Sequence, residues 1–324
     1  MKGAIVLSTG GLELVYGPEE RAEIGRMIEL VAPPLTAEQA RARLAELAGV
    51  EVLFSGWGAP VLDAAFLAAV PRLRLLLYGA GSVRGIVTDA AWDRGILVTT
   101  AAPVNAQPVA EYTLAAILFG LKRGWQQERA YRSGADRAAI AVPGAAGATV
   151  GLVSLGAVGR RVCALLHGFD VRIVAYDPFA AAEPGVELVA LEEVFRRADV
   201  VSLHTPNLPE TQGMVTGAHI ASMQPWAVFI NSSRGAVVRE AELAAALARR
   251  PDLHAVLDVT VTERPDGDGP LLALPNVTRT PHIAGSMGPE CRRMGRFMVD
   301  ELRRYLRGEP LQGGVTRERA RIMA

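Results

Sequence analysis

Hydrophobic residues occur in short continuous runs that alternate with helical patterns almost throughout the chain. In the amino-terminal third, strands are expected at Ala4–Leu7, Glu51–Phe54, Leu73–Leu77 and Ile96–Thr99. Apolar positions three and four residues apart predict helices at Glu19–Leu30, Thr36–Ala48, Val61–Ala69 and near Thr88–Asp93. Thr36 followed by Gln39 fits a capping box at the start of its helix. Apolar strands that alternate with helices are typical of parallel sheets in α/β proteins.

The same alternation continues in the carboxyl-terminal half. Strands are expected at Asp199–Leu203, Ala227–Ile230, Leu253–Asp258 and Val277–Thr280, and helices at Leu191–Arg197, Arg239–Arg249 and Met287–Arg307. Between the two series, Asn105–Arg132 is a long helical stretch with a broad apolar face. That face could pack inside the subunit or against a second subunit. A chain of 324 residues is long enough for two domains.

One segment, residues 148–177, carries a complete pattern for nucleotide binding. Thr149–Val153 suits a buried strand, Gly156 and Gly159 form a glycine-rich turn that opens a helix, and Val171–Tyr176 is a second strand that ends on Asp177. Glycine lets the backbone approach a pyrophosphate, and the helix N-terminus supplies N–H groups to it. The acid follows the last glycine by 177 − 159 = 18 residues, close to the spacing expected for a ribose-binding carboxylate.

The glycine motif has one departure, at its first position. The usual G-x-G-x-x-G is Ser154-Leu-Gly156-Ala-Val-Gly159 in this chain. A serine can occupy such a turn if its backbone φ is negative, so this departure weakens the match to the motif.

Composition excludes several classes of protein. Lys and Arg together number 34, as do Asp and Glu, so no net charge favours nucleic acid or an anionic membrane. No run of 18 apolar residues predicts a transmembrane helix. Two cysteines in a chain of this length suggest a reducing, cytoplasmic location without a disulfide framework. No metal-ligand cluster is apparent, and no metal is expected.

Polar residues follow the predicted strands, at the sheet edge where open parallel sheets bind ligands. In the amino-terminal third the strand ends are glycine-rich, Ser55–Pro60 and Tyr78–Val83. Both loops are candidate substrate walls, although simple turn formation would explain them as well.

Six motifs in order closely resemble the D-2-hydroxyacid dehydrogenases, a family that includes phosphoglycerate dehydrogenase and the glyoxylate/hydroxypyruvate reductases. Besides the glycine turn they are Val109-Ala-Glu111, Leu203-His-Thr-Pro206, Asn231-Ser-Ser-Arg-Gly235, Leu257-Asp-Val259 with Glu263, and Thr280-Pro-His-Ile-Ala-Gly285. The resemblance covers about residues 105–290 and is much weaker before them.

The resemblance implies two doubly wound parallel-sheet domains with a catalytic cleft between them. Residues 105–295 would form a Rossmann domain that binds NAD. Residues 1–104 and 296–324 would form a flavodoxin-like substrate domain. Family members are typically homodimers through the nucleotide domain, and Val109–Leu121 supplies apolar surface for such contact.

By the same resemblance, Arg234, Glu263 and His282 match the family's catalytic set. Reduction of a 2-keto acid needs a proton donor for the forming alkoxide, and histidine suits this role near neutral pH. A neighbouring carboxylate, here Glu263, favours the charged form of a histidine. A guanidinium such as Arg234 can bind the substrate carboxylate and polarise the keto oxygen. Taken singly, the three could be a turn arginine, a solvated loop acid and a cap at a strand end.

Cofactor positions carry over from the family in the same way. Those matched are Gly156, Ala157 and Val158 at the pyrophosphate, Asp177 at the ribose, His204, Thr205, Pro206 and Thr211 in the loop over the adenosine and nicotinamide, and Ser233, Asp258 and Gly285 near the nicotinamide. A carboxylate at 177 would repel a 2′-phosphate, and no arginine follows it. NADH is therefore expected in preference to NADPH.

For the substrate, the family's carboxylate-binding loop matches Tyr78–Ser82, with Ala80, Gly81 and Ser82 as candidate contacts and Trp57 as a candidate wall. The expected substrate is a small 2-keto or 2-hydroxy acid. An aromatic wall would favour an apolar or bulky side chain on that acid.

Two other functions remain open at this stage. The family's relatives include NAD(H)-responsive corepressors that bind protein partners, and phosphite dehydrogenases, whose substrate is not a carboxylate. The retained Arg/Glu/His set favours catalysis over the first, and does not separate the second.

Overall fold

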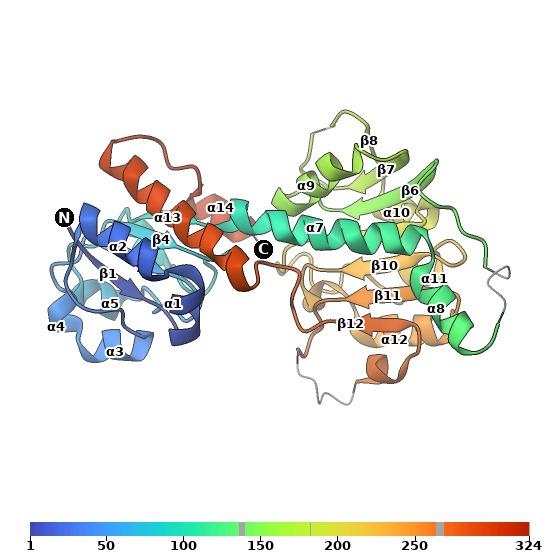
Figure 1. The fold of residues 1–324 in the computed structure, drawn as a ribbon, viewed down its shortest axis with the longest axis horizontal. Helices are drawn as coiled ribbons and strands as arrows, with labels where there is room; N and C mark the ends of the chain where they lie inside the picture. The colour runs from blue at the N-terminus through green and yellow to red at the C-terminus, as the bar shows by residue number, and fades with distance from the viewer. Residues whose placement is uncertain (136–139, 182, 264–268, 324) are drawn as a thin grey trace. The chain divides into compact units, whose positions relative to one another are not determined.

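The computed structural model describes residues 1–135, 140–181, 183–263 and 269–323. Residues 264–268, which follow Glu263, and residue 324 of the predicted substrate domain lie outside the described residues. The chain divides into two compact units (Figure 1). Unit 1 comprises Met1–Asn105 and Ser286–Met323, and unit 2 comprises Ala106–Gly285.

Unit 1 is built on a six-stranded sheet with the order β13-β5-β4-β3-β1-β2. Without β13, this is the 2-1-3-4-5 order of flavodoxin-like folds, as predicted. The strands are β1 Lys2–Val6, β2 Glu29–Leu30, β3 Val52–Ser55, β4 Leu75–Tyr78, β5 Leu97–Thr100 and β13 Gly314–Val315. The two-residue β13 is the exception to parallel pairing, since it runs antiparallel to β5.

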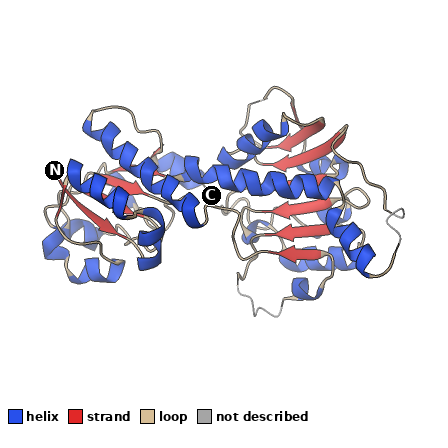
Figure 2. Cartoon of the chain, in the orientation of Figure 1, coloured by secondary structure: helices blue, strands red, loops and turns tan. Residues whose placement is uncertain are grey.

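Helices cover both faces of this sheet (Figure 2). One face packs against α1 Thr9–Val15, α2 Pro18–Met27 and α13 Cys291–Leu306, and the other against α3 Ala37–Ala42, α4 Leu44–Leu47, α5 Ala64–Ala69, α6 Asp89–Asp93 and α14 Arg317–Ile322. A short 3₁₀ turn, η4 Gly288–Glu290, precedes α13.

Several predicted elements of unit 1 need correction. The predicted helix Glu19–Leu30 ends at Met27, because Glu29 and Leu30 pair with β1 as a strand. The predicted helix Thr36–Ala48 breaks at Arg43, although the capping box of Thr36 and Gln39 is present. The sequence analysis did not predict α1, because its two glycines are unfavourable in a helix. Ser8 caps this helix by accepting a hydrogen bond from Gly11 N.

Unit 2 is built on a fully parallel seven-stranded sheet, with the order β12-β11-β10-β9-β6-β7-β8. When β6 is counted as the first strand, this is the 3-2-1-4-5-6 order of the Rossmann fold, with β12 as one further strand. Its strands are β6 Ala148–Val153, β7 Val171–Tyr176, β8 Val186–Leu188, β9 Val200–Leu203, β10 Val228–Asn231, β11 His254–Leu257 and β12 Val277–Arg279. Residues of β6, β9 and β10 are buried throughout, as expected for strands covered on both faces.

The two faces of this sheet carry different helices. On one lie α7 Ala102–Leu121, whose first residues belong to unit 1, and α9 Ala157–Leu166. On the other lie α10 Leu191–Arg197, α11 Gly217–Ala221 and α12 Glu240–Arg249, with the 3₁₀ turns η2 Gly235–Val237 and η3 Pro270–Ala273. Most of the apolar face of α7 is thus used inside unit 2, where Gly120 packs directly against Val200 and Val228. No helix among the described residues is long and apolar enough to cross a membrane.

The predicted helix Asn105–Arg132 is two helices, because Arg123 adopts a left-handed φ of 52° between α7 and α8 Gly124–Arg132. The Arg123 side chain is buried and bonds Asp199, whose other oxygen accepts from Thr149 N. This ion pair fixes the break over the start of β6 and β9.

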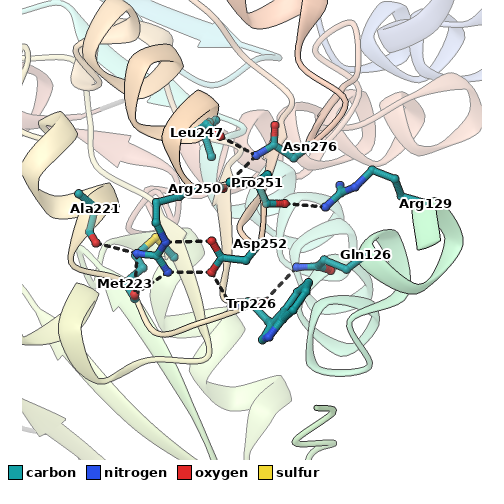
Figure 3. Close-up of polar contacts among 10 residues, drawn as sticks. All are labelled: Gln126, Arg129, Ala221, Met223, Trp226, Leu247, Arg250, Pro251, Asp252 and Asn276. Carbon is teal, nitrogen blue, oxygen red and sulfur yellow. Dashed lines mark hydrogen bonds and ion pairs between the residues drawn. The ribbon is translucent and has the colours of Figure 1, made fainter. Parts of the chain in front are cut away.

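The amino edge of the unit 2 sheet is closed by a polar network (Figure 3). Arg250 forms a two-point ion pair with Asp252, with nitrogen–oxygen distances of 2.9 and 2.8 Å. From α8, Gln126 donates to Trp226 O and Arg129 donates to Pro251 O. These bonds satisfy backbone groups where strands begin, so the network is structural and lies at the edge away from the candidate site.

Candidate active site

The candidate catalytic residues lie in three loops at the carboxyl edge of the unit 2 sheet. Arg234 follows β10, Glu263 follows β11 and His282 follows β12. Gly235 brings the first two loops together, because a Cβ at this position would lie 2.1 Å from the carbonyl carbon of Thr260. Only glycine permits this approach.

Glu263 and His282 form a direct pair, with 2.9 Å between Oε2 and Nδ1. Both side chains are about half exposed, 43% and 47%. A carboxylate on Nδ1 holds the proton on that nitrogen and directs Nε2 outward as the atom that exchanges a proton. The pair that the sequence predicted is therefore assembled in the structure.

Arg234 lies close enough to Glu263 for the two charges to interact. Burial lowers the pKa of the Arg234 guanidinium below its usual value, and the Glu263 carboxylate acts against that shift. The guanidinium also donates to Ser233 O over 2.6 Å. The three candidate residues thus form one charged group in which an arginine and a histidine share a carboxylate neighbour.

The turn that carries His282 is held by Asp258, a residue 2% exposed at the end of β11. One carboxylate oxygen accepts from Thr280 Oγ1 at 2.6 Å and Ile283 N at 2.8 Å, and the other from Ala284 N at 2.9 Å. Within this turn His282 has a left-handed φ of 55°, and its N–H donates to Asp258 O. A histidine in this conformation is strained and persists because the surrounding bonds fix the turn.

Sequence reasoning assigned Asp258 to the cofactor and missed this second connection. It also missed Tyr112 of α7, which donates to Thr280 Oγ1 over 3.0 Å and so extends the chain of bonds. Burial raises the pKa of Tyr112. The tyrosine's place on the apolar face of a helix gave no signal of this contact.

The glycine turn joins β6 to α9 as predicted. Gly156 is the N-cap of α9, and Ala157 and Val158 are its first residues. No atom lies within 4 Å of a Cβ built on Gly156, whereas a Cβ on Gly159 would lie 2.2 Å from Ser154 O. Gly156 thus leaves open space in front of the helix, and Gly159 allows the helix to pack closely on the strand.

Ser154 does not meet the condition given for serine in this turn, since its φ is +78° rather than negative. A left-handed conformation costs a non-glycine residue about 1–2 kcal/mol. Ser154 Oγ lies 2.8 Å from Thr205 Oγ1, and such a bond contributes about 0.5–1.5 kcal/mol. The hydrogen bond therefore offsets much of the strain of this backbone conformation.

Asp177 lies directly after β7, beside the glycine turn. Its Oδ2 accepts from Leu155 N at 2.7 Å, and its Oδ1 accepts from Phe179 N and Ala180 N. Each carboxylate oxygen has two lone pairs, so these bonds leave capacity for a ligand hydroxyl.

The β9 loop carries the four remaining adenosine-side candidates. His204 and Thr205 are buried, and Thr211 Oγ1 donates to Pro206 O. His204 Nε2 is buried without a hydrogen-bond partner, and burial lowers the pKa of His204 to about 4. His204 is therefore neutral, and it lies beside the glycine turn. An unpaired buried nitrogen at this place is consistent with a site that binds a polar ligand.

In the loop after β10, Ser233 Oγ donates to Asn231 Oδ1, and Gly285 is half-buried at the end of the turn that carries His282. Among the described residues, no group of three or more His, Cys, Asp or Glu side chains is placed to hold a metal ion.

The candidate substrate residues belong to unit 1. Trp57 is 40% exposed in the loop after β3, and Ala80, Gly81 and Ser82 form the loop after β4, with Ala80 buried. Both loops start from strand ends bonded to one buried side chain, Tyr16. Its hydroxyl donates to Ser55 O at 2.9 Å and lies 3.4 Å from Leu77 O.

The fold and site of unit 2 define a nucleotide-binding domain with a paired carboxylate and imidazole at the carboxyl edge of a Rossmann sheet. A family model for the D-isomer specific 2-hydroxyacid dehydrogenase NAD binding domain matches residues 114–284, more than half of the chain. The chain belongs to the D-isomer specific 2-hydroxyacid dehydrogenase family, as the sequence motifs indicated.

Named relatives support this membership. The chain is 33% identical to a glyoxylate reductase of Korarchaeum cryptofilum over 257 residues, 76% of this chain and 77% of the relative. It is 33% identical to D-3-phosphoglycerate dehydrogenase of Mycobacterium leprae over 80% of this chain and 51% of the relative. The chain thus spans about half the length of the phosphoglycerate dehydrogenases that it matches.

A solved structure of the family extends the likeness to the whole chain. A D-isomer specific 2-hydroxyacid dehydrogenase of Xanthobacter autotrophicus, in complex with NADPH and MES, superposes with a TM-score of 0.76 at 26% identity. The superposition covers 99% of this chain and 100% of the other.

Proposed function

We propose that the protein is an NAD(H)-dependent 2-keto acid reductase, equivalently a D-2-hydroxyacid dehydrogenase. The observation that supports this most is the 2.9 Å pair between Glu263 Oε2 and His282 Nδ1, with Arg234 as the neighbouring cation. A pair of this kind can deliver one proton and hold the charge that remains.

The residues around the glycine turn fit a dinucleotide. Gly156, Ala157 and Val158 would hold the pyrophosphate and Asp177 the adenosine ribose. His204, Thr205, Pro206 and Thr211 would line the adenosine side, and Ser233, Asp258 and Gly285 the nicotinamide side. The open space at Gly156 and the orphaned His204 Nε2 support this assignment. When bound, the nicotinamide supplies a hydride to the substrate C2.

The protein's own groups would perform the rest of the reaction. In unit 2, Arg234 binds the substrate carboxylate and polarises the keto oxygen. In unit 1, the family resemblance assigns substrate contacts to Trp57, Ala80, Gly81 and Ser82. The charged His282 donates its Nε2 proton to the oxygen that becomes the hydroxyl. Glu263 stabilises the imidazolium before transfer and keeps the ring oriented after it.

Oxidation of NADH with a panel of 2-keto acids tests the proposal, using glyoxylate, hydroxypyruvate, pyruvate, phenylpyruvate and branched-chain acids. We expect turnover that falls at least a hundredfold in His282→Ala. His167→Ala, which removes an exposed histidine at the end of α9, is the matched control and should keep wild-type activity. Clear NADH binding with no turnover on any acid would instead favour an NAD(H)-responsive binding protein.

We also propose that NADH is preferred over NADPH. Asp177 places a carboxylate beside Leu155 N, where a 2′-phosphate would meet its charge. The Xanthobacter relative is in complex with NADPH, so membership of the family does not determine which cofactor is preferred. The preference proposed for this chain therefore rests on Asp177. Asp177→Ala should narrow the ratio of kcat/KM for the two cofactors, and an unchanged ratio would show that Asp177 does not set it.

A homodimer through unit 2 is the proposed assembly. Phe119 of α7 remains 47% exposed beside Trp125, on a helix that is otherwise largely packed. Light scattering would show the mass of a dimer for the wild type and a shift toward monomer for Phe119→Asp.

A further inference from the structure

Ser154 occupies a position where the nucleotide-binding motif normally has glycine, and it does so in the conformation that favours glycine. At a φ of +78°, the Cβ of serine adds steric strain that glycine would not have. The side chain must therefore do something that glycine cannot, or the substitution would only add strain.

The turn is tied to both neighbours of β6 in the sheet. On the β7 side, Ser154 N donates to Tyr176 O over 2.7 Å, and Leu155 N donates to Asp177 Oδ2 over 2.7 Å. On the β9 side, the connection from the Ser154 side chain is its hydroxyl, 2.8 Å from Thr205 Oγ1. Glycine would keep the first set of bonds and lose the second.

Thr205 is well placed to fix the turn because it is itself held. It is 1% exposed, and its hydroxyl lies 3.4 Å from Val153 O, the residue before Ser154. His204 N donates to Val153 O as well. The hydroxyl pair therefore closes a short ring between the end of β6 and the start of the β9 loop.

We propose that Ser154 is a positioning residue that sets the affinity of the turn for the dinucleotide through its bond to Thr205. The bond holds two loops of the cofactor site in one arrangement before the ligand arrives. Binding then requires less ordering of the backbone, and preorganisation of this kind raises affinity. The inference rests on the proposed NAD(H) function and adds a residue that the family motif does not supply.

The test is a double-mutant cycle on NADH binding, measured by fluorescence titration of the whole protein without substrate. Ser154→Ala should raise the Kd for NADH about fivefold, the loss expected for one neutral hydrogen bond. In a Thr205→Val background, Ser154→Ala should change the Kd less than twofold. Thr205→Ser retains the hydroxyl and should restore most of the NADH affinity that Thr205→Val loses.

Ser154→Gly separates positioning from simple folding stability. It removes both the strain and the bond, so urea unfolding without cofactor should change little. The Kd for NADH should nevertheless rise at least fivefold, because the turn gains freedom. Ser222→Ala is the matched control, since this exposed serine caps α11 at the opposite sheet edge and should leave the Kd unchanged.

Three results would overturn the inference. The first is an equal effect of Ser154→Ala with and without Thr205, which would mean that the serine hydroxyl contacts the cofactor directly. The second is Ser154→Gly binding NADH as tightly as the wild type. The third is failure of the wild type to bind NADH, which would remove the proposed function as well, whereas the first two leave that function intact.

Discussion

The two sheets present candidate site residues at their carboxyl edges, but each unit holds those residues by different chemistry. In unit 2, the buried carboxylate of Asp258 accepts three hydrogen bonds from the turn that carries His282. In unit 1, the neutral phenol of Tyr16 bonds the strand ends from which both candidate substrate loops start. Burial raises the pKa of Tyr16, so this phenol stays protonated.

The difference shows how strictly each edge must be fixed. Hydrogen bonds to a charged group are stronger than neutral ones, and loss of the charged partner strands several donors at once. A catalytic imidazole tolerates little displacement, whereas loops that surround a substrate tolerate more. The comparison predicts large effects from damage to the carboxylate anchor and small ones from damage to the phenol.

The largest effect is expected for Asp258→Ala. The change leaves Thr280 Oγ1, Ile283 N and Ala284 N without their acceptor and releases the strained His282 turn. We expect 2-keto acid reduction to fall about a hundredfold or more, and the free energy of unfolding to fall by roughly 3–4 kcal/mol. Steady-state kinetics and urea unfolding measure the two losses.

Asp63→Ala in unit 1 is a matched control for that substitution. Asp63 caps α5 by accepting from Phe66 N, and it is not one of the candidate site residues. Its loss should lower the free energy of unfolding only slightly, with no loss of turnover. Turnover of Asp258→Ala within threefold of the wild type would show that the His282 turn does not depend on its carboxylate.

Low pH should destabilise unit 2 before unit 1, because all five histidines lie between residues 167 and 282 and so belong to unit 2. Burial lowers the pKa of His204 to about 4 and that of His254 to about 3. The unfolded chain binds these protons near pH 6.5 and the folded chain does not, so stability falls as pH drops through 6.5. Between pH 7.5 and 5.5 we expect a loss of roughly 2–3 kcal/mol.

Hydrogen exchange read by mass spectrometry, corrected for intrinsic rates, would resolve this loss by unit. Strands β6, β9 and β10 should lose protection, while β1, β3 and β4 keep theirs. His254→Gln removes one titrating group and retains an atom that can bond Thr278 in place of Nε2, so it should halve the loss. Equal loss in both units would mean that groups other than histidine control acid unfolding.

The sequence predicted the elements that repeat a simple pattern. Continuous apolar strands, the glycine turn and the polar residues after β10, β11 and β12 could be placed because each reports its own environment. The two sheet orders followed from the resemblance to a family. Pairing of Glu263 with His282 was expected from the same source and from the chemistry, and the structure shows the contact.

What escaped prediction depends on contacts between distant residues. Arg123 breaks a helix because Asp199 draws its side chain inward, and nothing within Asn105–Arg132 signals that partner. Ser154 keeps a left-handed backbone because Thr205 lies opposite it, 51 residues further on. The departure from glycine was visible in the sequence, but its consequence required the position of the neighbouring loop.

The smallest effect is expected for Tyr16→Phe, which removes one neutral hydroxyl from the core of unit 1 and leaves the ring packed edge-on against Phe54. The free energy of unfolding should fall by about 1 kcal/mol. Because Ser55 O and Leu77 O mark the ends of β3 and β4, the loops at Trp57 and Ala80–Ser82 should lose some of their fixed geometry. We expect KM for the keto acid to rise severalfold with kcat nearly unchanged, since binding is weakened equally before and during the chemical step.

Tyr131→Phe provides the reference for that measurement, since this tyrosine of α8 is 82% exposed and should alter neither constant. A fall in kcat as large as the rise in KM would place Tyr16 in support of the reacting geometry, as Asp258 is. The Tyr16 phenol and the Asp258 carboxylate would then be equally important for the geometry of their loops. The number of hydrogen-bond donors left without an acceptor would not determine the loss of activity. An unchanged KM would instead show that backbone bonds alone, such as Gly79 N to Ser55 O at 2.8 Å, suffice to shape the substrate loops.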